Sequence, residues 1–146
     1  GSEMCIRDSD WTGTRDITAH CSIPLVIDGM ANLVEGGWPE IMQRNHNMAI
    51  EGRRILCERL GIEPPCPDDM IGCIAALPLP EVATGGIPLH VPDPLHELLQ
   101  DKYGIQIPVW SWPSPRGRFV RISAHLYNDV EEYHYLAEAL ATELEL

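Results

Sequence analysis

Positive charge is scarce in this 146-residue sequence. Ten lysine and arginine residues stand against 22 aspartate and glutamate residues, so the formal net charge is -12. Domains that bind nucleic acid carry a basic patch, and segments that bind membrane surfaces carry clustered lysine and arginine. The composition therefore argues against a nucleic-acid partner and against a membrane partner. Because the acidic residues are spread along the chain, they indicate solubility rather than a binding site.

Long apolar runs and paired cysteines are absent as well. No apolar run approaches the length of about 20 residues that spans a bilayer, and we expect a cytoplasmic protein. The five cysteines form no C-x-x-C pair and match no zinc-binding spacing. They are expected to be reduced thiols, most of them packed as small apolar groups. His90 and His96 flank a proline-rich turn, where surface histidines are more common than a metal site, so no metal is predicted.

The first nine residues do not have the features of a natural start. In the letters GSEMCIRD the methionine stands fourth, and neither the basic region nor the apolar core of a signal peptide is present. The segment resembles the translated adapter of a transposase-based sequencing library. We therefore expect residues 1–9 to be an artefact and the natural coding sequence to be cut near Asp10. A genuine disordered tail is the alternative.

The first predicted helix covers Ile17 to Val34. Asp16 is a good N-cap for it, and Pro24 should kink or divide it. The glycine pair at residues 36–37 ends it. This helix is apolar nearly all round, so it should be buried in something larger than the rest of this chain.

A long amphipathic helix is predicted from Trp38 to Leu60, with Gly61 as its stop. Its apolar positions recur at helical spacing: Trp38, Ile41, Met42, Met48, Ala49, Leu56 and Leu60.

The second half of the chain alternates strands and helices. Strands are predicted over residues 70–80, 105–112 and 118–127. A short helix follows Asp93 as N-cap and ends at Gly104, and a last helix follows Asn128 as N-cap, with Glu131 in a capping-box position. The chain is long enough for one domain with a real core. The fold class expected is α+β, a small and mostly antiparallel sheet with helices on one face.

The last predicted strand places an arginine among alternating side chains. One face is apolar and should join the core, with Val120, Ile122, Ala124 and Leu126. The other face carries Phe119, Arg121, Ser123 and His125. From the pattern alone, Arg121 is either a solvent-facing or structural arginine, or a group that binds a carboxylate through two parallel hydrogen bonds.

Gly13 and Thr14 lie just before the first helix. Free backbone N–H groups and a hydroxyl at such a position can bind an anion, most often a phosphate. A simple N-terminal turn is the alternative.

Four motifs together resemble one family. They are, in chain order, WTGTRD, EGRRILCERLG, AALPLP and VRISAHLYN. Their order is similar to that of class V aminotransferase-like pyridoxal-phosphate enzymes, in particular the isopenicillin N epimerase-like branch. The resemblance extends from Trp11 to the C-terminus.

The resemblance implies the C-terminal small domain of the fold-type-I pyridoxal-phosphate-dependent transferase architecture. Residues 10–36 would be the tail of the cofactor-binding large domain, and residues 37–146 the small domain with its long leading helix. Gly13 and Thr14 would contact the phosphate of pyridoxal 5'-phosphate in the neighbouring subunit of a homodimer. Arg121 would bind the α-carboxylate of an amino-acid substrate.

One departure from the family concerns its cofactor lysine, which forms a Schiff base in the large domain. The only lysine here, Lys102, lies near the end of a polar helix and is expected to be a solvated charge. No catalytic residue is therefore assigned in this chain, and the piece alone should be inactive.

A second departure narrows the activity. Cysteine desulfurases of this class carry a nucleophilic cysteine on a loop before the equivalent of Arg121, and the letters VWSWPSPRGRFV contain none. Desulfurase activity is therefore not expected. Trp110 and Trp112 lie in this region, either packed or lining a substrate pocket.

The sequence thus predicts a C-terminal fragment of a pyridoxal-phosphate-dependent enzyme that acts on an amino acid, of epimerase or racemase, aminotransferase or lyase type. The alternative is a stand-alone α+β binding or dimerisation module without a cofactor.

Overall fold

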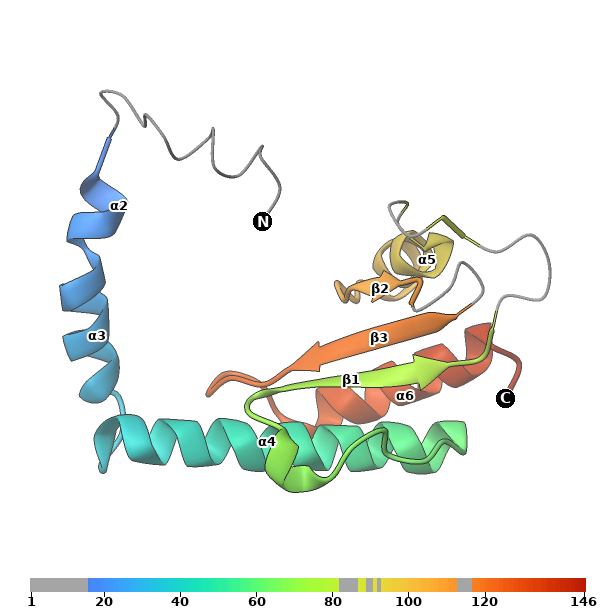
Figure 1. Cartoon of the computed structure of the whole chain (residues 1–146), viewed down its shortest axis with the longest axis horizontal. Helices are drawn as coiled ribbons and strands as arrows, with labels where there is room; N and C mark the ends of the chain where they lie inside the picture. The colour runs from blue at the N-terminus through green and yellow to red at the C-terminus, as the bar shows by residue number, and fades with distance from the viewer. Residues whose placement is uncertain (1–15, 82–86, 89–90, 92, 113–116) are drawn as a thin grey trace. The chain divides into compact units, whose positions relative to one another are not determined.

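A computed structural model of the chain describes residues 16–81, 87–88, 91, 93–112 and 117–146 (Figure 1). The chain divides into two compact units, residues 1–38 and 39–146.

The first unit contains two short helices, α2 (Thr18–Cys21) and α3 (Ile23–Ala31). The predicted division of this helix is confirmed, and it falls at Ser22. Pro24 fits the first turn of α3 because a backbone N–H at that position would have no partner within the helix. The predicted N-cap is off by one residue: Ile17 occupies that position, while Asp16 Oδ1 accepts a hydrogen bond from Thr18 N at 2.8 Å.

The apolar surface of α3 is largely exposed. No residue of α2 or α3 is buried. Among residues 16–38, the large exposed apolar side chains are Ile17, Ile23, Leu25, Val26, Ile27, Leu33 and Trp38. Trp38 Nε1 donates to Ile27 O at 3.0 Å, which ties the end of the unit to α3. That a larger body covers this helix stays a prediction.

The long helix α4 (Gly37–Leu60) matches its predicted range closely. Gly61 follows it with a φ of 65°, and Ile62 N donates to Cys57 O at 3.0 Å, the arrangement with which a glycine ends a helix. Its buried stripe includes three polar or small residues, Asn45, Gly52 and Arg53, that interrupt the apolar pattern.

Three antiparallel strands form one sheet in the order β1–β3–β2. Their bounds are Ile74–Leu79 for β1, Val109–Trp110 for β2 and Arg118–Ser123 for β3. The small antiparallel sheet is confirmed, although each strand is shorter than predicted. β1 begins four residues later than predicted: Met70 belongs to a 3-10 turn, η1 (Asp68–Met70), and residues 71–73 connect this turn to the strand.

The helix α5 (Pro94–Tyr103) begins and ends as predicted. Asp93 Oδ1 accepts a hydrogen bond from Leu95 N at 2.9 Å, and Gly104 closes the helix with a φ of 67°.

The last helix, α6 (Val130–Glu143), has its cap one residue later than predicted. Asp129, not Asn128, is the N-cap, and Glu132, not Glu131, completes the capping box. Asn128 stabilises the preceding turn instead, because its Oδ1 accepts a hydrogen bond from His125 N at 3.0 Å.

The core lies against one face of the sheet. Buried side chains of α4, α5 and α6 join those of the three strands in a single cluster. Leu77 and the residue paired with it, Val120, are fully buried, whereas their neighbours Arg121 and Ser123 point away from the core and are exposed. In Figure 1, α4 and α6 run along the same side of β1 and β3. The second unit is therefore an α+β domain, as expected.

A buried ion pair joins α5 to the sheet. Arg118 Nε and Nη2 donate to the two carboxylate oxygens of Asp93 at 2.7 and 2.8 Å, and Asp93 is 1% exposed. The same carboxylate caps α5, so one side chain fixes both the start of the helix and its position against β3. A buried charge that loses its partner is costly.

Asp93→Asn tests this pair, because asparagine still caps a helix but leaves the Arg118 charge without its counterion. We expect the free energy of unfolding to fall by about 3 kcal/mol in urea titrations of the full chain. Asp101→Asn, at an exposed site of α5, is the matched control. A change of less than about 0.5 kcal/mol for Asp93→Asn would show that the pair is dispensable.

Gly52 is required where α4 meets α6. A Cβ at this position would lie 2.7 Å from Cδ1 of the Tyr133 ring, and the Tyr133 hydroxyl is held by a 3.0 Å bond to Ser123 O. The ring cannot move away without breaking that bond.

Gly52→Ala is therefore expected to lower stability by about 1–3 kcal/mol through overpacking. Gly29→Ala, in α3 with no atom within 4 Å of its Cβ, should gain helix propensity instead. Thermal unfolding followed by circular dichroism measures both. Equal effects of the two substitutions would contradict the close approach of α4 and α6.

Candidate carboxylate-binding site

Arg121 lies in the middle of β3 on the face of the sheet opposite the buried side chains of Val120 and Ile122. We call this surface the open face; it consists of Ile74, Ala76, Pro78, Trp110, Phe119, Arg121 and Ser123. The residue paired with Arg121 across β1 is Ala76, whose small side chain leaves the arginine exposed. The backbone is fixed on the other side, where Arg121 N donates to Pro108 O at 3.2 Å.

The guanidinium of Arg121 is not committed to a partner within the described part of the chain. Acidic groups of α6 are engaged elsewhere: Glu132 accepts from Asn128 Nδ2 at 2.8 Å, and Glu143 accepts from Lys102 Nζ at 2.7 Å. Arginine offers a planar fork of N–H donors that matches a carboxylate. Arg121 therefore presents, on the open face, a cation that is unpaired within the described ranges and suited to a bidentate anion.

Aromatic side chains flank this arginine. Trp110 stacks on Phe119 with ring centroids 6.3 Å apart, and Trp112 is exposed. The contact favours packing for Trp110, one of the two roles that the sequence left open. Trp112 has no ring partner among the described residues.

Arg121 also lines a cavity of about 370 Å³ between the end of β3, residues 103–108 and α6. Polar side chains reach it from three elements: Gln106, Ser123, Glu132 and Tyr135. Pockets of this size accept small organic ligands.

His125 does not accompany Arg121, contrary to the predicted alternation. β3 ends at Ser123, and the turn that follows takes His125 and Leu126 to a different cavity beside α4. Leu126 is consequently only half-buried rather than part of the core.

The predicted phosphate-binding residues, Gly13 and Thr14, lie outside the described residues. Nearby Asp16 is described. Hydrogen bonds from the hydroxyl and backbone N–H of Thr18 lower the pKa of its carboxyl group.

Lys102 is a surface charge, as the sequence indicated. Its ammonium is exposed and pairs with Glu143, and that hydrogen bond raises the pKa of the lysine. A lysine that binds a cofactor covalently has to be free to react, so Lys102 does not fit that role. The described residues do not complete a pyridoxal-phosphate site.

Among the described residues, no group of three or more histidine, cysteine, aspartate or glutamate side chains could hold a metal ion, and His96 Nδ1 lies 2.6 Å from Ile107 O. None of the described helices combines the length and the apolar character needed to cross a bilayer.

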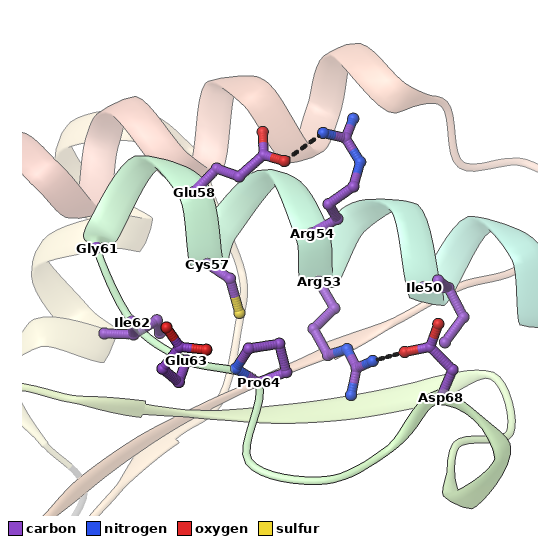
Figure 2. Close-up of a pocket in the computed structure, with 10 residues that line it drawn as sticks. All are labelled: Ile50, Arg53, Arg54, Cys57, Glu58, Gly61, Ile62, Glu63, Pro64 and Asp68. Atoms are coloured by element: carbon purple, nitrogen blue, oxygen red, sulfur yellow. Dashed lines mark hydrogen bonds and ion pairs between the residues drawn. The ribbon is translucent and has the colours of Figure 1, made fainter.

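A groove of about 520 Å³ runs between α4 and residues 61–68 (Figure 2). Arg53 points into it from α4, is 3% exposed, and holds the loop through Asp68 and through Cys66 O at 2.7 Å. Arg54 points away and binds Glu58 at 2.6 Å. Both arginines therefore form structural ion pairs: Arg53 with the loop after α4, and Arg54 with glutamates of α4 itself.

The burial of Arg53 and Asn45 in α4 was not predicted from the sequence. Both lie at a spacing of four from Ala49, in the middle of the apolar stripe of α4. A polar residue inside such a stripe is the available signal, since buried polar groups require partners.

Known proteins similar to this chain are enzymes. A probable chloroplastic L-cysteine desulfhydrase of Arabidopsis thaliana is 32% identical over an alignment of 139 residues, which covers 91% of this chain and 29% of that protein. An isopenicillin N epimerase of Amycolatopsis lactamdurans is 32% identical over an alignment of 143 residues, which covers 96% of this chain and 33% of the epimerase. A further L-cysteine desulfhydrase of Arabidopsis thaliana is 29% identical over an alignment of 150 residues, gaps included, which covers 94% of this chain and 32% of that protein.

The chain spans about a third of the length of the curated relatives it matches. No family model matches it. The similarity makes L-cysteine desulfhydrases and isopenicillin N epimerases its homologues, and it supports the resemblance drawn from the four motifs.

The thiols differ in exposure, and only part of the prediction for them is confirmed. Cys57 is buried and lines the groove of Figure 2, whereas Cys21 and Cys73 are exposed. Burial raises the pKa of Cys57.

Iodoacetamide should therefore modify Cys21 and Cys73 at least about tenfold faster than Cys57, because the thiolate is the reactive form. Mass spectrometry of tryptic peptides at increasing times measures the three rates. Alkylation of Cys57 at the rate of Cys73 in the folded chain would contradict its burial.

Proposed function

We propose that this chain is the C-terminal part of a longer class V pyridoxal-phosphate-dependent enzyme that acts on an amino acid. Arg121 binds the α-carboxylate of the substrate in this proposal. The observation that carries it is the exposed guanidinium in the middle of β3, which has no partner among the described residues. The homologous desulfhydrases and epimerase, whose names specify amino-acid or amino-acid-derived substrates, support it.

Arg121 orients the substrate in this account. Two parallel N–H···O bonds fix both the position and the plane of a carboxylate, which a lysine ammonium does not do. Phe119 and Pro78, paired across β3 and β1 on the same face, supply apolar surface beside it. Once this face is covered, the low local dielectric strengthens the ion pair.

The covering body is the large domain of the full-length protein in this proposal. It would also supply the cofactor lysine, since Lys102 is engaged with Glu143. The exposed apolar side chains of α3 support it, because a surface of this kind needs a partner. The piece alone would then be inactive.

Gly13 and Thr14 keep their proposed role at the cofactor phosphate of the neighbouring subunit, which requires a homodimer. A cytoplasmic location also remains part of the proposal.

The names of the relatives favour two of the three reaction types considered for this enzyme. A desulfhydrase is of lyase type and an epimerase inverts a stereocentre, so these two outcomes are favoured over transamination. L-Cysteine is the first substrate to test, with sulfide release and loss of optical rotation as the two readouts.

The rival proposal, a stand-alone α+β binding or dimerisation module, explains the exposed face of α3 by contact with a second copy. It gives no reason for the similarity to amino-acid enzymes, and no other observation favours it.

Arg121→Lys in the full-length enzyme tests the carboxylate contact. We expect kcat/KM for the amino acid to fall about 10- to 100-fold, mainly through KM, because one bidentate charge-assisted contact is lost. Steady-state kinetics with the preferred substrate measures the effect.

Arg54→Lys is the matched control, since Arg54 is exposed on α4 and braces two glutamates of its own helix. Unchanged kinetics in Arg121→Lys, with the control also unchanged, would remove Arg121 from the substrate site.

A further inference from the structure

The cavity beside Arg121 lies where β2 and β3 separate. The ladder between these strands ends with the 3.2 Å hydrogen bond from Arg121 N to Pro108 O. Beyond this bond, the chain that precedes β2 turns towards α5, where Ile107 O lies 2.6 Å from Nδ1 of His96. A fork of about 370 Å³ is left between β3, residues 103–108 and α6.

The fork leaves one backbone donor and one backbone acceptor of β3 without partners among the described residues. In an antiparallel pair such as Arg121 and Pro108, each residue normally donates to the other, but proline has no N–H, so the Arg121 carbonyl receives no bond. The Ser123 N–H faces the same side as that of Arg121, because the residue after it, Ala124, donates to Cys73 O on the other side of β3. The Arg121 carbonyl and the Ser123 N–H therefore point towards the cavity, which both residues line.

Both sides of the fork are held against α6. The Tyr133 hydroxyl donates to Ser123 O at 3.0 Å, and the Tyr135 hydroxyl donates to Tyr103 O at 3.2 Å. The opening is thus fixed by the packing of the helix, so a ligand that enters it meets a preformed site.

Most polar side chains around the cavity are already engaged. Asn128 donates to Glu132 at 2.8 Å, and the hydroxyls of the three lining tyrosines each donate to a protein oxygen. The side chains of Gln106, Arg121 and Ser123 are exposed and have no hydrogen-bond partner within the described ranges. The rest of the lining is apolar or glycine. The free groups are therefore one cation and several neutral donors and acceptors.

We propose that this fork selects the side chain of the amino acid whose carboxylate Arg121 binds, and that it favours a side chain ending in a carboxamide. The inference rests on the proposed function. The oxygen of a carboxamide can accept from Ser123 N–H, and its NH₂ group can donate to the Arg121 carbonyl. A carboxylate side chain lacks the donor and would share the cavity with the Glu132 carboxylate. An ammonium side chain lacks the acceptor.

L-Glutamine is the probe, titrated into the isotope-labelled full chain and followed by NMR. Saturable shifts are expected at the Ser123 backbone amide and at Nε–H of Arg121, with a dissociation constant on the order of 1 mM for so small a ligand. L-Norleucine has an apolar side chain of similar length, so it should still shift Nε–H of Arg121 but bind at least about tenfold more weakly.

Pro108→Ala separates recognition from folding. The alanine N–H can donate to the Arg121 carbonyl, so the acceptor is occupied and the ladder gains a bond. We expect the affinity for L-glutamine to fall at least about threefold while that for L-norleucine is unchanged. Thermal stability should be retained, because the added bond offsets the loss of the proline constraint on the unfolded chain. Pro65→Ala, in the exposed loop after α4, is the matched control and should bind as the wild type does.

Three results would overturn the proposal and leave the carboxylate contact of Arg121 intact. These are equal affinities for L-glutamine and L-norleucine, unchanged affinity for L-glutamine in Pro108→Ala, or tighter binding of L-glutamate or L-ornithine than of L-glutamine. If none of these amino acids shifts Nε–H of Arg121, the carboxylate contact itself is overturned, and this inference with it. The two failures are therefore distinguishable.

Discussion

The pairing of β1 with β3 is the constraint on which the rest of the domain depends. Its register places Leu77 opposite Val120 on the core side and Ala76 opposite Arg121 on the open face. Because side chains alternate along a strand, a slip of one residue would bury the arginine and expose the valine. The helices fix that register: the Asp93–Arg118 pair holds α5 against β3, and Gly52 lets α4 approach Tyr133 of α6. The proposed carboxylate site is therefore a product of the sheet register rather than of a flexible loop.

Some buried polar side chains of the domain have hydrogen-bond partners that stabilise it, and others do not. Asp93 and Arg53 are buried with their charges paired, and they join elements that would otherwise separate. Within the described part of the chain, Asn45 Oδ1 and Nδ1 of His125 are buried without a hydrogen-bond partner, and such groups lower the stability of the fold.

Much of the fold could be predicted because local signals decide it. Gly61 and Gly104 end their helices where the sequence indicates, and Asp93 caps α5 as expected. The errors arise where local signals compete: Asn128 and Asp129 are both good caps, and only the turn at His125 decides between them. Arg121 was identified from strand alternation and from family resemblance. The position of His125 beside α4 depends on contacts between that helix and a distant turn, which a single sequence does not specify.

The central claim is that this chain is one part of a larger pyridoxal-phosphate enzyme, and the genomic DNA upstream of the Trp11 codon tests it most directly. The account predicts an uninterrupted reading frame that continues upstream into a large domain with a lysine after an apolar strand. A ribosome-binding site and start codon immediately before the Asp10 codon would contradict it, and the binding or dimerisation module would then be the better account of this chain.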